Sequence, residues 1–403
     1  MLWKDFSIFI NIRLRYYHSI IMLSLFKVFM SEDVIEPVNK VLMSGYITQG
    51  KKVEEFESAL STYLDQPRVL TLNSATAGLT LALRLLKNPT DSWPGFLDED
   101  EVLTPALTCF ATTSAILSNG ANIKWLDVDP NTANIDFDDL KNKLSPTTKA
   151  IYIVHWGGCP VNLDKLKELQ EHSFRLYGFK PMIIEDCAHA FGAEYNGRKI
   201  GNGHSDNICV FSLQAIKHLT TGDGGIITLP TQELYDRCKL LRWYGIDRDK
   251  RNYKGKDFRM ENDIVESGYK FHMNDINATI GLHNLPHIDR LLEKDRANAA
   301  FYNKELEEID GVTLLEQYGN PAYWLYTMRV TRKEEFINFM KDNNIMASQV
   351  HNRNDINSCV SEFRTELPNL DVVEQDLVCI PVGWWLEQSD LDYIVRKIKE
   401  FYQ

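Results

Sequence analysis

The chain has 403 residues, of which 44% are hydrophobic and 25% are charged, so it is long enough for a large core and for two domains. Its formal net charge of −12 argues against general nucleic-acid binding, and we expect no nucleic-acid partner. The seven cysteines are scattered and form no C-x-x-C pair. This pattern predicts reduced thiols in a cytoplasmic protein, with no metal site.

The first 21 residues are apolar, aromatic and basic. Lys4, Asp5, Arg13 and Arg15 interrupt the apolar run, which makes it too charged for a membrane span, and it has no signal-peptide cleavage site. We therefore expect no membrane partner. Residues 1–21 are interpreted as an N-terminal extension, either disordered or the product of an upstream start. An interfacial helix is the alternative.

Strand and helix patterns alternate along most of the chain. Ser31 is placed to cap a helix that runs to Met43, and alternation then continues to about Leu285. Such alternation is typical of an α/β fold with a mostly parallel central sheet and helices on both faces. The clearest predicted strands are 102–104, 123–126, 150–154 and 182–184.

A second unit is predicted after residue 287. A long helical stretch from Ile288 to about Leu306 leads into a smaller C-terminal α/β unit, which holds a strand at 326–330 and a final helix at 391–401. We therefore divide the chain into a large domain, residues 22–287, and a small C-terminal domain, residues 288–403.

The first motif with chemical meaning follows the alternating apolar run 69–72. Asn73, Ser74, Ala75 and Thr76 lead there into a helical pattern rich in Ala and Leu. Small residues at a helix start leave backbone N–H groups open to an anion, and the helix dipole favours a phosphate. Ser74 also fits an ordinary N-cap, so the motif alone leaves both interpretations open.

The second motif is an apolar strand, residues 182–184, that ends in Glu185 and Asp186, with His189 three residues later. Ligand-binding groups of open α/β sheets lie at the carboxyl ends of strands. An acid at that position suits a cofactor with a basic ring nitrogen that must stay protonated. The alternative is that Asp186 merely caps the following segment.

The third motif centres on Lys217, which comes five residues after Ser212 and is followed by a Gly-rich turn and the apolar run 226–229. A lysine held between two buried strands is partly desolvated, which lowers its pKa and favours the free amine that forms Schiff bases. The next residue, His218, would face the opposite way if this stretch is extended. Taken alone, the pattern also fits an ordinary solvated lysine.

Together these motifs resemble the DegT/DnrJ/EryC1/StrS family of nucleotide-sugar aminotransferases, which depend on pyridoxal phosphate (PLP) and have the aspartate aminotransferase fold type I. The resemblance runs from about Leu23 to the C-terminus. Its opening is the run 44–56, SGYITQGKKVEEF. Further matching segments are 104–108, 154–158, 241–245 and 268–274.

The resemblance implies a role for each motif residue. Lys217 would hold PLP as a covalent Schiff base and act as the catalytic acid and base. Asp186 would pair with the pyridinium nitrogen, and His189 would lie near the phenolic oxygen of the ring. The phosphate-binding positions fall on Ala75, Thr76 and Ser212.

The chain also departs from the family pattern. Ala75 stands where Gly is usual, which still permits close backbone approach. The ring-stacking position falls on Cys109, with Phe110 beside it, and the sequence leaves open which of the two faces the cofactor. Lys270 replaces an Asn that usually reaches a neighbouring subunit's cofactor phosphate, and a lysine can still contact phosphate as a point charge.

By resemblance, the expected reaction moves the amino group of L-glutamate to a nucleotide-linked 4-keto-6-deoxyhexose. Amination of a 3-keto sugar nucleotide is the alternative, as are a PLP-dependent dehydratase and a non-catalytic regulatory relative. Lys217 argues against the dehydratase, because those relatives carry His at this position. The segment that contains Lys270 further predicts a homodimer with shared active sites.

An anionic nucleotide sugar requires a basic patch on this acidic chain. The stretch 248–259 offers one, and we take Arg248, Lys250 and Arg251 as substrate-binding candidates, together with His351 in the C-terminal unit. A solvated loop is the alternative interpretation of the stretch.

Overall fold

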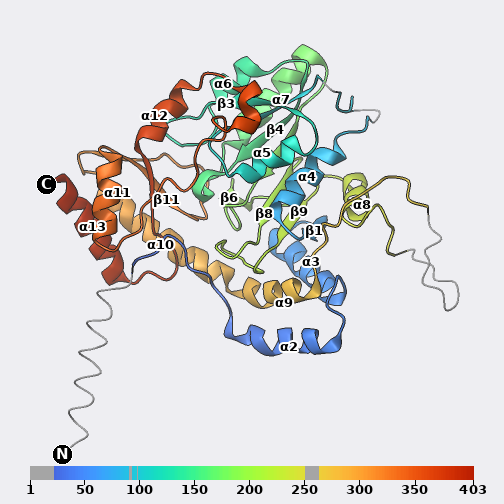
Figure 1. Cartoon of the computed structure of the whole chain (residues 1–403), viewed down its shortest axis with the longest axis horizontal. Coiled ribbons are helices and arrows are strands. Elements are labelled where there is room, and N and C mark those ends of the chain that lie inside the picture. The colour runs from blue at the N-terminus through green and yellow to red at the C-terminus, as the bar shows by residue number, and fades with distance from the viewer. Residues whose placement is uncertain (1–21, 90–92, 98, 250–262) are drawn as a thin grey trace, which may run out of the picture.

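The computed structural model describes residues 22–89, 93–97, 99–249 and 263–403 (Figure 1). Its centre is a seven-stranded sheet with the strand order β1-β9-β8-β5-β4-β2-β3. Five strands, β3, β2, β4, β5 and β8, run parallel to one another, whereas β9 is antiparallel to both β8 and β1. The strands are β1 (Val69–Leu72), β2 (Glu101–Pro105), β3 (Asn122–Leu126), β4 (Thr148–Val154), β5 (Met182–Asp186), β8 (Ile208–Ser212) and β9 (Gly225–Thr228).

Both faces of this sheet are buried. Along β8, Ile208 and Val210 belong to one core cluster, while Cys209 and Phe211 belong to another, as expected when successive side chains point to opposite faces. Figure 1 shows the covering helices on both sides. They include α3 (Lys51–Leu64), α4 (Ala75–Leu85), α5 (Phe110–Leu117), α6 (Phe137–Lys143), α7 (Leu163–Tyr177), α8 (Gln232–Leu241) and α9 (Asp275–Asn284).

The C-terminal part has its own antiparallel sheet, in the order β10-β11-β12, and its own core cluster. The strands are β10 (Val312–Leu314), β11 (Tyr326–Val330) and β12 (Leu377–Ile380). The helices are α10 (Ile288–Leu306), α11 (Lys333–Asp342), α12 (Pro368–Asp376) and α13 (Gln388–Tyr402), with the 3-10 turn η4 (Ser358–Phe363).

Shorter elements complete the fold. Before α2 (Ile35–Ser44), the backbone forms the 3-10 turn η1 (Glu32–Val34), and Ser31 caps it by accepting a hydrogen bond from Asp33 N. The remaining elements of the described residues are the hairpin β6 (Glu194–Tyr195) and β7 (Arg198–Lys199) and the 3-10 turns η2 (Trp156–Gly158) and η3 (Leu285–His287).

The predicted fold class is confirmed: the large sheet is mostly parallel, and a smaller α/β unit follows it. The domain boundary after residue 287 stays a prediction. The expectation for residues 1–21 falls outside the described residues. Within the described part of the chain, none of the helices combines the length and the apolar character needed to cross a lipid bilayer.

Candidate active site

Lys217 lies in the connection between β8 and β9, at the carboxyl end of β8. The stretch is not extended there, because the backbone N–H of Lys217 donates to the carbonyl of Gln214 in a turn, at 2.9 Å. The side chains of Asn277 and Asn284 on α9 donate to carbonyl groups later in the same connection. The loop that carries the lysine is therefore fixed by α9 as well as by its two strands.

His218, the residue after Lys217, lies in the same turn, and its ring contacts the C-terminal unit. The ring of His218 donates from Nε2 to the carbonyl of Ala322, at 3.0 Å, and lies 3.8 Å from a carboxylate oxygen of Asp295. The condition under which His218 would face away from Lys217, an extended stretch, is therefore not met, because the antiparallel return to β9 requires a turn here.

The amine of Lys217 is withdrawn from water. Its Nζ lies 3.4 Å from the ring centroid of Trp324. Burial lowers the pKa of Lys217 to about 7, although the negative charge of Asp186 acts in the opposite direction. At neutral pH a substantial fraction of the lysine is therefore the free amine, which is the nucleophilic form.

Asp186 ends β5 and points its carboxylate toward α5. One oxygen accepts a hydrogen bond from Thr112 Oγ1 at 2.7 Å, and the other accepts from the backbone N–H of Ala188 at 3.1 Å. Burial raises the pKa of Asp186, while these two hydrogen bonds and the charge of Lys217 lower it. The carboxylate thus has the donors that a buried anion needs.

Histidine and tryptophan rings gather beside the lysine. The imidazole of His189 stacks on Trp324, with centroids 3.9 Å apart, and is parallel to the ring of His351 at 5.5 Å. Trp156 meets both histidine rings edge to face. His189 Nδ1, His351 Nε2 and Trp156 Nε1 are buried without a protein partner. These unpaired polar atoms provide hydrogen-bonding capacity for a bound group.

Burial sets the charge of both histidines. It lowers the pKa of His189 well below its usual value, and it lowers the pKa of His351 to about 4, with the charge of Lys217 acting in the same direction. Both rings are therefore neutral at physiological pH, so each has one donor and one acceptor nitrogen.

The predicted phosphate-binding residues meet at the start of α4. Ser74 is the N-cap and accepts a hydrogen bond from the first turn of the helix, so Ala75 and Thr76 are its first two residues. Ser212 pairs with Gly225 across β8 and β9. A Cβ on Gly225 would lie 2.4 Å from the carbonyl group of Ser74. Glycine is therefore required to bring the two strands against this helix start.

Cys109 and Phe110 begin α5, near Asp186. Cys109 is exposed, and Phe110 is 38% exposed. Of the two, Cys109 is close enough to Lys217 to affect the pKa of that lysine. This proximity favours Cys109 as the residue that faces the lysine, and its contact with the cofactor ring stays a prediction.

Lys270 is exposed in the single chain. Its backbone bridges to Trp243, and its carbonyl accepts a hydrogen bond from the Asn73 side chain at 3.2 Å. A reach across to another subunit is compatible with this exposure.

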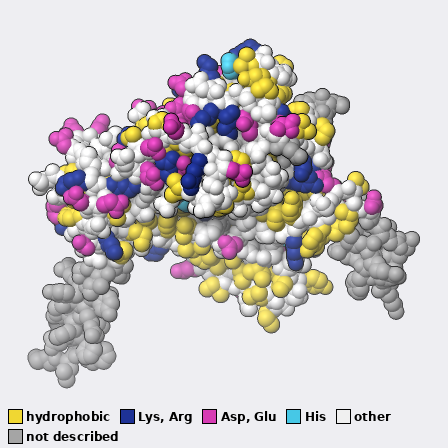
Figure 2. Space-filling view, turned by 45° about the horizontal axis from the view of Figure 1, so that its top comes forward, with side chains coloured by type: hydrophobic (Ala, Val, Ile, Leu, Met, Phe, Trp, Pro, Cys, Tyr) yellow, Lys and Arg dark blue, Asp and Glu magenta, His cyan; other side chains and the backbone are white. Residues whose placement is uncertain are grey.

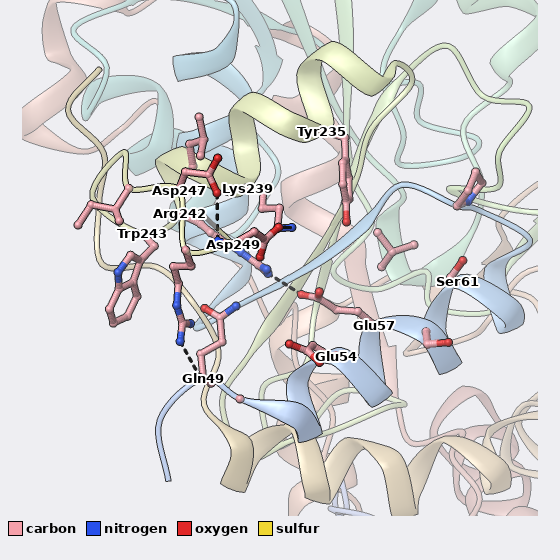
Figure 3. Close-up of a pocket in the computed structure, with 17 residues that line it drawn as sticks. Gln49, Glu54, Glu57, Ser61, Tyr235, Lys239, Arg242, Trp243, Asp247 and Asp249 are labelled. Atoms are coloured by element: carbon pink, nitrogen blue, oxygen red, sulfur yellow. Dashed lines mark hydrogen bonds and ion pairs between the residues drawn. The ribbon is translucent and has the colours of Figure 1, made fainter. Parts of the chain in front are cut away.

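Arg248 lies in a different place, in a cavity of about 480 Å³ (Figure 3). Its guanidinium donates to the carbonyl of Gln49 and stacks on the ring of Trp243. None of the Lys217 site residues lines this cavity. The other two predicted basic residues, Lys250 and Arg251, fall outside the described residues. The cavity is further lined by Glu54, Glu57, Tyr235, Lys239, Arg242, Asp247 and Asp249.

One cluster in the described residues has a composition that resembles a metal site. It consists of His155, Glu185 and Cys187, which are all buried and lie at the ends of β4 and β5. His155 Nδ1 accepts from the backbone N–H of Val161, so the neutral ring carries its hydrogen on Nε2 and donates it to Glu185 at 2.8 Å. No ring lone pair is then left for an ion, and the pair is a structural hydrogen bond.

Trp324, Thr112 and Trp156 are site residues that the sequence analysis missed. Trp156 lies in the matching segment 154–158 but was given no role there, and Trp324 and Thr112 carry no local signal, because a tryptophan or threonine beside a strand is usually a packing residue. Only the folded chain brings residue 324 to residues 189 and 217.

Comparisons with known proteins agree with this geometry. The DegT/DnrJ/EryC1/StrS aminotransferase family matches residues 29–399. The chain is 30% identical to the UDP-4-amino-4-deoxy-L-arabinose–oxoglutarate aminotransferase of Shewanella sediminis, over 92% of this chain and 96% of that protein.

Two solved structures extend the comparison. The sugar aminotransferase CalS13 from Micromonospora echinospora is 45% identical, with a TM-score of 0.88, and the match covers 94% of this chain and all of that one. A putative sugar aminotransferase from Streptococcus pneumoniae, solved in its PLP form, is 26% identical, with a TM-score of 0.82 and coverage of 94% and 98%. The predicted fold type and cofactor agree with these relatives. The chain belongs to the DegT/DnrJ/EryC1/StrS aminotransferase family.

Proposed function

We propose that this protein is a PLP-dependent sugar aminotransferase that uses Lys217, Asp186 and His189 as its central residues. The observation that carries the proposal is a desolvated lysine amine beside a buried strand-end carboxylate, with the start of α4 held against Gly225 at the end of the same connection. When bound, PLP withdraws electrons from the carbon that carries the amino group.

The described residues fit this cofactor. The first turn of α4 at Ala75 and Thr76, with the hydroxyl of Ser212 nearby, offers donors to a phosphate. The carboxylate of Asp186 is the proposed negative partner of the cofactor's ring nitrogen. The unpartnered Nδ1 of His189 supplies a hydrogen bond to a ring substituent. Cys109 is the proposed ring-facing residue.

Lys217 is the proposed proton carrier. With a pKa lowered to about 7, its amine takes up and releases a proton at nearly equal cost near neutral pH, which is the condition for efficient acid–base catalysis. The surrounding Trp156, Trp324 and histidine rings exclude bulk water, so few competing proton donors reach the reacting carbon.

The proposed amino donor is L-glutamate, and the acceptor is a nucleotide-linked 4-keto-6-deoxyhexose, which becomes a 4-amino-4,6-dideoxy sugar. The name of the Shewanella relative, a 4-amino sugar–oxoglutarate aminotransferase, supports position 4 and this donor. His351, which lies parallel to His189 beside Lys217, is the proposed sugar contact. Arg248, Lys250 and Arg251 are proposed for the nucleotide diphosphate.

We also propose a homodimer with shared sites. Lys270 is exposed, and its segment matches the one that reaches a neighbouring subunit's cofactor in this family. Hydrophobic side chains gather along the lower part of the molecule in Figure 2, where α2 lies. Ile35 is 74% exposed, Met43 80% and Tyr46 85%. An apolar surface of this kind suits burial against a second copy.

An absorbance titration tests the proposal. Purified protein loaded with PLP should show the visible band of a lysine-bound cofactor, and L-glutamate should convert it to the band of the aminated cofactor. Addition of a 4-keto-6-deoxyhexose nucleotide should restore the first band, and NMR of the product should place the new amine at C4. An amine at C3 would favour the alternative regiochemistry, and a spectrum unchanged by L-glutamate would reject transamination.

A further inference from the structure

A short segment of the C-terminal unit, residues 322–325, is fixed against both loops of the candidate site. Its backbone N–H groups at Ala322 and Leu325 donate to the carbonyls of Gly158 and Gly157, at 3.0 and 3.2 Å. The ring of His218 donates to the carbonyl of Ala322. A Cβ on Gly158 would lie 2.7 Å from the carbonyl oxygen of His189, so glycine permits this close approach.

The segment delivers Trp324 to the lysine. Trp324 is 6% exposed, and its indole N–H donates to the carbonyl of Ile216 at 2.8 Å. Its ring stacks on His189 at 3.9 Å with an interplanar angle of 20°, and it also stacks on Phe26 at 4.7 Å. These contacts fix the position and the tilt of the indole ring, so the orientation of its two faces relative to Lys217 is also fixed.

The amine of Lys217 uses this fixed ring. Its Nζ lies 3.4 Å from the Trp324 centroid, well within the range of a cation–π contact, and tryptophan provides the strongest such contact. Burial alone would remove the water around the ammonium form of Lys217, and the lost hydration energy would not be replaced. The negative face of the indole, together with the Asp186 carboxylate, replaces part of that lost hydration.

We propose that Trp324 is a positioning residue for Lys217, whose ring face holds the lysine's ammonium group inside the site whenever that group is not bonded to the cofactor. The inference rests on the proposed function, since it gives the released lysine a defined place to keep its proton. It also explains why the residue comes from the C-terminal unit: this segment closes the site around a lysine from the large sheet.

The competing explanation is that Trp324 only fills space between Phe26 and His189. Two substitutions separate these roles. Trp324→Phe keeps an aromatic face but loses the hydrogen bond to Ile216, whereas Trp324→Leu keeps an apolar side chain and loses the face. Tyr63→Leu is a matched control, because it removes the ring under a different lysine, Lys199, whose Nζ lies 4.3 Å from that ring.

The experiment measures how fast the full-length, cofactor-free protein captures PLP at each pH, followed by absorbance. Capture bonds the free amine of Lys217 to the aldehyde carbon with loss of water, so the rate falls below the pKa of that amine. The wild type should show this break near pH 7. In Trp324→Leu the break should move down by about half a unit to one unit, because the ammonium loses its ring.

In Trp324→Phe the capture rate should fall at a pH closer to the wild-type value than in Trp324→Leu. In Tyr63→Leu the rate should fall at the wild-type pH. Circular dichroism checks that each variant is folded. A Trp324→Leu break at or above the wild-type pH overturns the inference while leaving the proposed function intact. Failure of the wild type to capture PLP at all overturns both.

Discussion

The hydroxyl of Thr112 donates a 2.7 Å hydrogen bond to the carboxylate of Asp186 across the gap between α5 and the end of β5. The donor matters because burial alone raises the pKa of Asp186, whereas this bond lowers it. Thr112 thus helps to keep the acid ionised, and an ionised acid is what the proposed contact with a ring nitrogen requires.

Thr112→Val should therefore raise the pKa of Asp186. The folded protein then protonates this group at higher pH, so the acidic limb of the activity profile should shift upward. Loss of a hydrogen bond to a charged group predicts a decrease in kcat of about tenfold to a hundredfold. Thr112→Ser retains the hydroxyl and should stay near the wild type. A pH–rate profile of Thr112→Val that overlays the wild type would contradict this role.

Asp186→Asn should slow transamination by several orders of magnitude while changing the melting temperature far less. A neutral amide cannot hold a ring nitrogen protonated, so the electron-withdrawing power of the bound cofactor falls. His189→Ala should be milder, because that ring only tunes a substituent. Steady-state kinetics beside thermal melts make the comparison. A nearly silent Asp186→Asn would mean that this acid is only a structural cap.

Lys217→Ala should abolish turnover and leave the fold intact. The substitution removes both the anchoring amine and the proton carrier, and His218 cannot replace it, since its ring is bonded to the carbonyl of Ala322. Activity should be measured together with the visible absorbance, which should lose the band of the lysine-bound cofactor. Retention of more than a few per cent of wild-type activity would disprove the assignment.

Gly225→Ala should weaken PLP retention. The new methyl group would lie 2.4 Å from the carbonyl group of Ser74 and 2.7 Å from the N atom of Ala75, so the start of α4 must move. Equilibrium dialysis against PLP should show the loss. Ser74→Ala is a useful comparison, since it removes the helix cap, at a cost of about 1 kcal/mol in stability, without adding a methyl group against the helix start. Unchanged PLP affinity in Gly225→Ala would place the phosphate elsewhere.

The shared-site proposal is tested with Lys270→Glu. This charge reversal should weaken cofactor retention in the homodimer. Mixing with an inactive Lys217→Ala subunit should restore activity, because one site of each mixed dimer then has Lys217 from one chain and Lys270 from the other. Lys270→Arg is the control that keeps the charge. An active monomer in sedimentation, or no recovery on mixing, would exclude shared sites.

The sequence predicted the fold well where its periodicity is strong. The strand 326–330 and the helix that starts at Ile288 have the predicted limits, since alternation and helical spacing are unambiguous there. The antiparallel direction of β9 was not predicted, because an apolar run reads the same in both directions. The turn at Lys217 and His218 was not assigned either, because its position depends on the direction of β9.

The candidate site divides in a similar way. Ser74, Asp186 and Lys217 could be found from the sequence because each lies at the junction of a strand or helix, where its local pattern marks it. Trp324 and Thr112 could not, because their importance comes from contacts made across the fold. No period or spacing in a sequence encodes a cation–π contact between a loop and a distant unit.

The hydrogen bond from Trp324 to Ile216 joins residues that are 108 positions apart. A chain still emerging from the ribosome can pair β8 with β9 long before Trp324 has been synthesised. The burial that lowers the pKa of Lys217 thus depends on the C-terminal unit as well as on the large sheet. If the domains fold in the order of synthesis, the lysine loop forms before its amine acquires that lowered pKa.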